Sequence, residues 1–164
     1  MRFSDFYFSE RLDEATVKQL RSGVNDARKK RSKPIKSELK SVGKDGSIRF
    51  DSTSITTENK NTWEQVISPS KRIPKDVSLA EFRDYYNGDV RVFCGCPDFH
   101  YRFAYRGTEE GYKLGNKELR PSNITNPENM QFPQGTVCKH LENALTVLKP
   151  NLPLILKQYR EKNK

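Results

Sequence analysis

The sequence is poor in apolar residues and contains no long hydrophobic run. Only 34% of its 164 residues are hydrophobic, against roughly 45–50% in an average globular domain, and the mean hydropathy is -0.88. No stretch approaches the about 18 consecutive apolar residues that a membrane-spanning helix needs, and the first residues lack the basic and then apolar order of a signal peptide. We expect one soluble domain with a small core.

Cysteine is also scarce, and its spacing argues against a disulfide framework. The chain has three cysteines, which is an odd number, and a single residue separates Cys94 from Cys96. A disulfide between these two would be badly strained. Metal ligation is the better interpretation of the pattern.

Motifs of the common enzyme classes are missing as well. The sequence contains no HExxH, no GxxxxGK[ST], no glycine-rich dinucleotide loop and no Ser/His/Asp order. We therefore expect a protein that is not an enzyme, with neither a small-molecule substrate nor a membrane partner.

The charge that is present lies near the two ends of the chain. Lys and Arg number 30 against 21 Asp and Glu, which gives a net charge of +9, and segments 21–44 and 149–164 account for +7 and +4 of it. All other residues together carry a net charge of -2, which is nearly neutral. This distribution predicts an aromatic and basic N-terminal helical arm (1–44), a central domain (45–149) and a basic C-terminal tail (150–164).

The basic side chains are candidates for contacts with nucleic acid or with a protein partner. Cations in such clusters neutralise phosphates or anchor acidic surfaces. The candidate residues are Arg28, Lys29, Lys30, Arg31, Lys33, Arg102 and Arg106. The alternative is that charged ends are simply solvated.

Hydrophobic periodicity predicts an α+β fold with a small antiparallel sheet. Apolar and polar residues alternate in three segments, which we predict to be strands: 47–51, 63–67 and 90–94. Aromatic residues at every second position from Phe99 to Tyr105 predict a further strand, with an aromatic face that belongs to the core and a basic face. The alternative is that Tyr101 or Tyr105 stacks on unpaired bases.

Three helices are expected. Apolar residues spaced by three and four predict one helix over 13–30, capped by Asp13 or Thr16. A capping box begins a short helix at Ser78, and a third helix carries an apolar stripe over 141–148 and ends at Pro150. The aromatic residues near the N-terminus are expected to dock on this protein or on a partner: Phe3, Phe6, Tyr7 and Phe8.

Two short motifs supply the side chains with the clearest chemistry. Cys94-Gly95-Cys96 follows a predicted strand, and Cys138-Lys139-His140 begins the last predicted helix. Together they provide three thiolates and one imidazole, the usual donor set of a closed, tetrahedral, structural zinc site. Gly95 is expected to allow a tight turn. The alternative is three structural cysteines and an ordinary histidine at a helix start.

Two further residues near these motifs could take part in the metal site. His100 is a rival nitrogen ligand, but it lies on a predicted strand, so we prefer His140. Asp98 either orients a ligand imidazole or is an exposed turn residue. A metal ion here would hold together the ends of the long insertion, residues 97–137, and so stabilise a domain with a small core.

The pattern of Cys-x-Cys, a spacer and Cys-x-His at a helix start resembles the SWIM zinc finger. The resemblance implies a strand-strand-helix unit and one structural Zn²⁺ bound by Cys94, Cys96, Cys138 and His140. The longer block from Cys94 to Tyr105, with Asn126-Pro127 and Cys138-Lys139-His140-Leu141, is similar to small SWIM-type proteins of tailed bacteriophages.

The phage resemblance covers about residues 45–149 and carries the expectation of function. It implies a non-enzymatic, zinc-stabilised structural protein of a phage particle, which docks on neighbouring virion proteins through its terminal arms. The expected location is the virion or the reducing host cytoplasm. The alternative is a zinc-dependent module that binds nucleic acid, as a phage regulator or a DNA-contacting protein.

Overall fold

The structure, a computed structural model, describes residues 15–55, 60–119 and 136–164 and contains both helices and strands. In chain order the elements are β1 (Ala15–Thr16), α1 (Val17–Ser22), α2 (Asp26–Ser32), β2 (Lys36–Val42), β3 (Ile48–Ile55), β4 (Lys60–Pro69), α3 (Leu79–Asn87), β5 (Asp89–Cys94), the π-helical turn η2 (Phe99–Phe103), α4 (Ala104–Glu109) and α5 (Lys139–Lys162). Among these residues, no helix combines the length and the apolar character needed to cross a bilayer.

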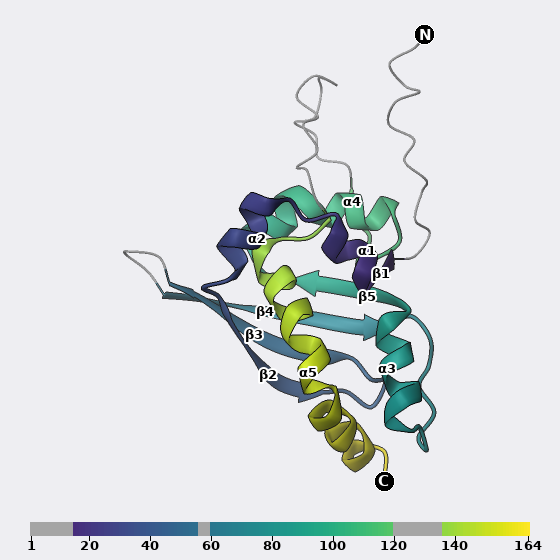
Figure 1. The fold of residues 1–164 in the computed structure, drawn as a ribbon. Helices are drawn as coiled ribbons and strands as arrows, with labels where there is room; N and C mark the ends of the chain where they lie inside the picture. The colour runs from purple at the N-terminus through teal and green to yellow at the C-terminus, as the bar shows by residue number, and fades with distance from the viewer. Residues whose placement is uncertain (1–14, 56–59, 120–135) are drawn as a thin grey trace.

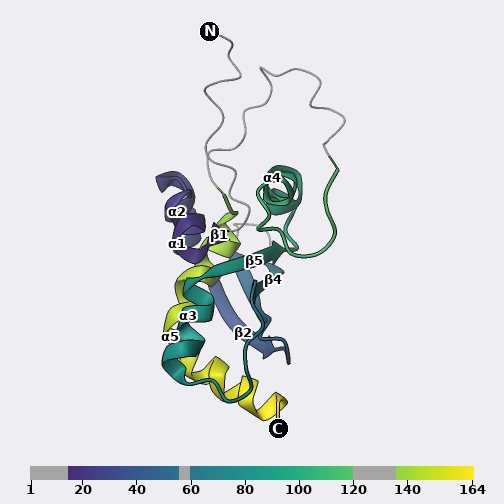
Figure 2. The same cartoon turned by 90° about the vertical axis from the view of Figure 1, so that its right-hand side faces the viewer.

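The strands form one antiparallel sheet of five, in the order β1-β5-β4-β3-β2. Helix α5 lies across one face of this sheet, and α1, α2 and α3 lie on the same side (Figures 1 and 2). The structure thus confirms the expected α+β fold, with a small antiparallel sheet and a C-terminal helix beside the cysteines and His140.

The strands β3, β4 and β5 confirm the three that were predicted from alternation. In β3, Ile48 and Phe50 are buried and Arg49 between them is exposed. The alternation in β3 arises because its inner face packs against α5 and its outer face is open to solvent, whereas η2 covers part of the outer face at β5. On that outer face Arg49 pairs with Glu64 at 2.8 Å.

The edge strand β2 was not predicted, because Ser37 occupies one inward position and a register shift between Leu39 and Ser41 breaks the two-residue period. Ser37, Leu39 and Val42 point inward, while Lys36 and Lys40 are exposed. Lysines on the outside of an edge strand discourage pairing with other chains. Part of the segment that was assigned to a basic arm therefore pairs with β3 in the sheet.

The single helix expected over residues 13–30 is wrong: α1 ends at Ser22 and α2 begins at Asp26. Thr16 caps α1, and the Asn25 side chain caps α2 by accepting a hydrogen bond from the backbone of Arg28 at 2.9 Å. A Cβ at Gly23, in the break, would lie 2.5 Å from Thr136. The break therefore lets the chain pass close to the segment before α5.

The strand expected over residues 99–105 is also wrong, because these residues form η2 and the start of α4. The helical path buries Phe99 and Phe103, four residues apart, and leaves Tyr101 77% exposed. Residues spaced by four share a helix face, whereas residues spaced by two do not. The expected continuous aromatic face does not exist.

Helix α5 does not end at Pro150, as predicted, but continues through Pro150 and Pro153 to Lys162. A proline inside a helix costs about 3 kcal/mol. Packing offsets this cost, because four side chains continue the buried stripe: Leu152, Ile155, Leu156 and Tyr159. The Tyr159 hydroxyl also donates to the Ile73 carbonyl at 2.8 Å.

The other expectations lie partly within and partly outside the described residues. The capping box at Ser78 is confirmed, and it begins α3. After α4 the insertion returns to the sheet, where the Leu114 amide donates to the Val92 carbonyl at 2.9 Å. The proposed cap Asp13 and the aromatic residues of segment 3–8 lie outside the described residues, as does segment 120–135 of the insertion.

If segment 150–162 is packed as described, Ile155→Ala will destabilise the protein and Leu154→Ala will not. Ile155 is fully buried, so truncation leaves a cavity and costs about 2–5 kcal/mol, while the change at the 48% exposed Leu154 costs about 0.5 kcal/mol or less. Urea unfolding at a fixed metal concentration measures both. Equal, small effects would show that this segment is not part of the core.

Candidate metal centre

The two motifs singled out in the sequence meet where β5 ends and α5 begins (Figure 1). Cys94 is the last residue of β5, and Cys96 follows in the connection to η2. Cys138 is the N-cap of α5, and His140 lies in its first turn. Each ligand pair is therefore held by the end of a regular element.

The four side chains form one compact, buried cluster. The three sulfurs and one imidazole nitrogen all lie within 4.8 Å of one another, and none of the four residues is more than 3% exposed. Donors at 2.0–2.3 Å from a central ion are about 3.5–3.8 Å apart in a tetrahedron. Small side-chain rotations bring the cluster to that geometry, so these residues can hold a metal ion.

His140 gives independent support for a bound cation. It is 3% exposed, and neither ring nitrogen makes a hydrogen bond of normal geometry within the described residues. A buried polar atom without a partner is costly, and a metal ion would use the lone pair of one nitrogen. The rival ligand His100 is exposed on η2 and lies outside the cluster.

The protonation of the thiols depends on how closely they are packed. Hydrogen bonds from Cys138 and Cys94 hold the pKa of Cys96 far below its ordinary value. Burial is the largest cause that raises the pKa of Cys138, and the neighbouring Cys94 and Cys96 raise it further. Cys138 lowers the pKa of Cys94, but Cys96 and burial outweigh that effect and raise it to about 12. Thiolates packed this closely repel one another, and a cation among them would favour the charged form of all three.

The backbone around the cluster also favours negative sulfur. The Phe99 amide donates to Cys96 Sγ at 3.3 Å, and Cys138 lies at the N-terminal end of α5, which carries a partial positive charge. Gly95 does not have the role expected from the sequence. Its φ is not positive, and an added Cβ would meet only the Glu64 carbonyl, at 3.8 Å.

Gln65 contacts the cluster and was not recognised in the sequence. It is fully buried on β4, opposite Cys94 on β5, and its Nε2 donates to Cys94 Sγ at 3.5 Å and to the Trp63 carbonyl at 2.6 Å. Its Oε1 accepts a hydrogen bond from Ser52 Oγ. The only sequence signal is a polar residue at an inward position of a predicted strand.

This contact begins a row of polar side chains that crosses the sheet to α5 and α2, buried at Gln65 and Ser52 and half-buried at Ser37 and Asn143. The hydroxyls of Ser52 and Ser37, which lie on neighbouring strands, are 2.5 Å apart. Ser37 Oγ donates to Asn143 Oδ1 at 2.6 Å, and Asn143 Nδ2 donates to the Ser32 carbonyl at 3.0 Å. The row thus connects Cys94 with the helices that cover the sheet.

Two of the basic candidates have internal partners. Arg28 is 8% exposed, with its guanidinium 4.7 Å from the centre of the Phe103 ring and 3.8 Å from Asp98. Arg106 pairs with Glu110 at 2.9 Å. Both side chains therefore take part in holding η2 and α4 in place.

The other basic candidates are more accessible. Arg102 pairs with Asp98 at 3.3 Å and keeps 57% of its side chain exposed. On α2 and just after it, Lys29 is half-buried, and Lys30, Arg31 and Lys33 are exposed. Asp98, which was considered as a partner of a ligand imidazole, instead joins two arginines.

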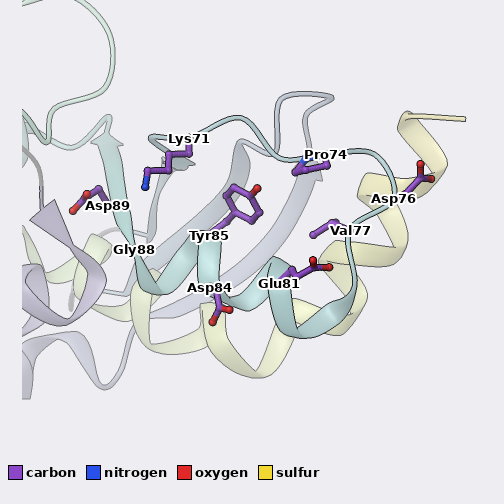
Figure 3. Close-up of a pocket in the computed structure, with 9 residues that line it drawn as sticks. All are labelled: Lys71, Pro74, Asp76, Val77, Glu81, Asp84, Tyr85, Gly88 and Asp89. Atoms are coloured by element: carbon purple, nitrogen blue, oxygen red, sulfur yellow. The ribbon is translucent and has the colours of Figure 1, made fainter.

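A separate cavity of about 420 Å³ lies beside α3 (Figure 3). Four carboxylates line it together with Lys71 and Tyr85: Asp76, Glu81, Asp84 and Asp89. The Glu81 carboxylate is already engaged, since it accepts hydrogen bonds from Ser78 at 2.6 and 2.9 Å. Among the described residues that line it there is no cysteine, histidine or serine.

We expect Gln65→Leu to weaken metal binding by about 10–100-fold, because the N–H···S hydrogen bond to Cys94 is lost. Competition with a chromophoric chelator for Zn²⁺ measures the affinity. Asn143→Ala is the matched control: it breaks the far end of the polar row and should lower stability without changing affinity. Unchanged affinity in Gln65→Leu would show that this bond does not support the site.

Comparisons with known proteins give no relative for this chain. No family model matches it, and the searches of curated proteins and of solved structures found no match. The function has to be argued from the residues of the site and from the surface around them.

Proposed function

We propose that this chain is a non-enzymatic docking protein whose fold is held together by one structural Zn²⁺. The observation that carries the proposal is the closed set of donors, Cys94, Cys96, Cys138 and His140, all buried and within 4.8 Å of one another. Three thiolates and one imidazole are typical ligands of zinc in structural sites, and soft sulfur donors disfavour Mg²⁺ and Ca²⁺.

A structural role fits this donor set better than a catalytic one. A catalytic zinc ion keeps one position open for water or substrate. Here protein side chains supply all four donors, and none of them is more than 3% exposed. The nearby carboxylate of Glu142 is already engaged through one oxygen, Oε1, which pairs with Arg21 at 3.3 Å. Its other oxygen, Oε2, is buried and has no partner within the described residues.

The proposed zinc ion joins parts of the fold that are far apart in the chain. It would tie the end of β5 and the following turn to the start of α5, across the long insertion. Metal binding of this kind contributes about 10 kcal/mol or more to folding in small zinc peptides. This free energy matters more in a chain that is only 34% hydrophobic, because its apolar core is small.

The docking partners are proposed to be neighbouring proteins of a tailed-phage particle. This part of the proposal is supported by the sequence resemblance to SWIM-type phage proteins. It is also supported by exposed cations on and just after α2, which can meet acidic surfaces: Lys30, Arg31 and Lys33.

The two histidines give a matched test of the metal proposal. The wild-type protein should bind one zinc ion per chain, and a chelator should lower its unfolding temperature. His140→Ala should lose more than about 100-fold in zinc affinity, whereas His100→Ala, at an exposed position, should bind as the wild type does. Metal analysis and calorimetry provide the readouts.

Cys138→Ser extends this test to the fold itself. Cys138 is fully buried in the cluster, so its loss should prevent cooperative folding rather than only weaken metal binding. A zinc-free Cys138→Ser protein that unfolds cooperatively at the wild-type temperature would overturn the structural-zinc proposal.

The particle proposal has its own test, which does not depend on the metal. Mass spectrometry of gradient-purified particles of the phage that encodes the chain should detect it at a constant ratio to a capsid subunit. Its absence from purified particles, despite expression in infected cells, would overturn the docking role and leave the zinc site unaffected.

A further inference from the structure

The turn η2 carries an exposed aromatic side chain on a firmly held backbone. Tyr101 is 77% exposed, and His100 lies edge-on to it, with the two rings 4.9 Å apart. The neighbouring side chain, Arg102, is 57% exposed. An aromatic ring this exposed has no role in the core of the described structure.

The residues on either side of Tyr101 anchor the turn to the rest of the fold. Phe99 packs edge-on against Phe93, at 6.2 Å between ring centres, and its amide donates to Cys96 Sγ at 3.3 Å. Phe103 lies under the Arg28 guanidinium. These contacts anchor the backbone on both sides of Tyr101, which reduces the entropy cost of ordering the turn when a partner binds.

Cations from a distant part of the sequence lie at the same end of the molecule. Asp98, at the start of η2, pairs with both Arg28 of α2 and Arg102 of η2, so the two elements are adjacent. The α2 helix and the helical segment that follows β5 share this end of the molecule in Figure 1. On α2, Lys30 and Arg31 are exposed.

We infer that this end of the molecule binds single-stranded nucleic acid. Tyr101 stacks on an unpaired base, and Arg102, Lys30 and Arg31 neutralise phosphates. Aromatic residues beside a basic surface are the usual combination for single strands, because every base offers a flat face and every nucleotide a charge. In a duplex the base faces are already stacked, so Tyr101 has no partner there.

This inference does not depend on the particle proposal, but it requires the metal centre to be intact. Cys96, a proposed ligand, accepts the hydrogen bond that holds the start of η2. Every variant is therefore tested with zinc bound, and its zinc content and unfolding temperature are measured on the same sample.

The first experiment measures fluorescence anisotropy of a labelled oligothymidine and of a blunt duplex of random sequence, at about 50 and 150 mM salt. We expect the single strand to bind more tightly. Tyr101→Ala should weaken its binding by about 5- to 100-fold, and Tyr101→Phe, which keeps the ring, by less than about twofold. Equal binding by Tyr101→Ala and wild type would overturn the stacking role.

The second experiment compares two double variants that lose the same charge. Lys30→Gln with Arg31→Gln should reduce the salt dependence by about 1.4 in log–log slope, because each phosphate contact on a single strand contributes about 0.7. The control, Lys71→Gln with Arg72→Gln, changes exposed cations of the loop after β4 and should leave the slope unchanged.

Three results would overturn the inference while leaving the zinc proposal intact. They are equal effects of the two double variants, preference for the duplex over the single strand, and no binding at about 50 mM salt by a folded, zinc-loaded protein. In the last case we would conclude that this surface binds a protein partner instead, such as an acidic subunit. Failure of the zinc proposal would instead appear as a chain without bound metal.

Discussion

The structure depends most on the junction between the end of β5 and the first turn of α5. β5 lies between β1 and β4 in the sheet, and α5 is the helix that covers the sheet. Four buried side chains meet at this junction, and their thiols cannot all ionise together without a cation. A metal ion in the cluster would therefore add to the apolar packing that attaches α5 to the sheet, and α1 and α2 pack against the same helix.

The small core contains a row of polar side chains, and the junction explains their presence. Gln65 donates to Cys94, and Ser52, Ser37 and Asn143 continue the row to α5 and α2. Buried polar groups lower stability unless each has a partner, and these four have partners on different elements. The row fixes the positions of strands and helices relative to the candidate metal ligands. An apolar core of the same volume would fix these positions with less geometric specificity.

The sequence was sufficient for the parts of the fold that rest on local patterns. β3 and β5 show alternation, Ser78 shows a capping box, and the three cysteines and His140, which the structure brings into one cluster, have short spacings at element ends. Other features depend on packing between distant segments. The extension of α5 beyond Pro150 needs the loop near Ile73, and Gln65 becomes important only when β4 pairs with β5. β2 was missed because Ser37 occupies an inward position and the register shift after Leu39 interrupts the hydrophobic period.

The segment 99–103 shows how a wrong secondary structure leads to a wrong functional reading. As a strand it would place Phe99, Tyr101 and Phe103 on one face, and that face would be core. In the helical turn the two phenylalanines are buried and the tyrosine between them is exposed. The phenylalanines and the Cys96 sulfur then form the support for Tyr101. A metal ion at Cys96 would therefore hold the exposed surface in shape as well as the fold, so loss of the ion should impair both together.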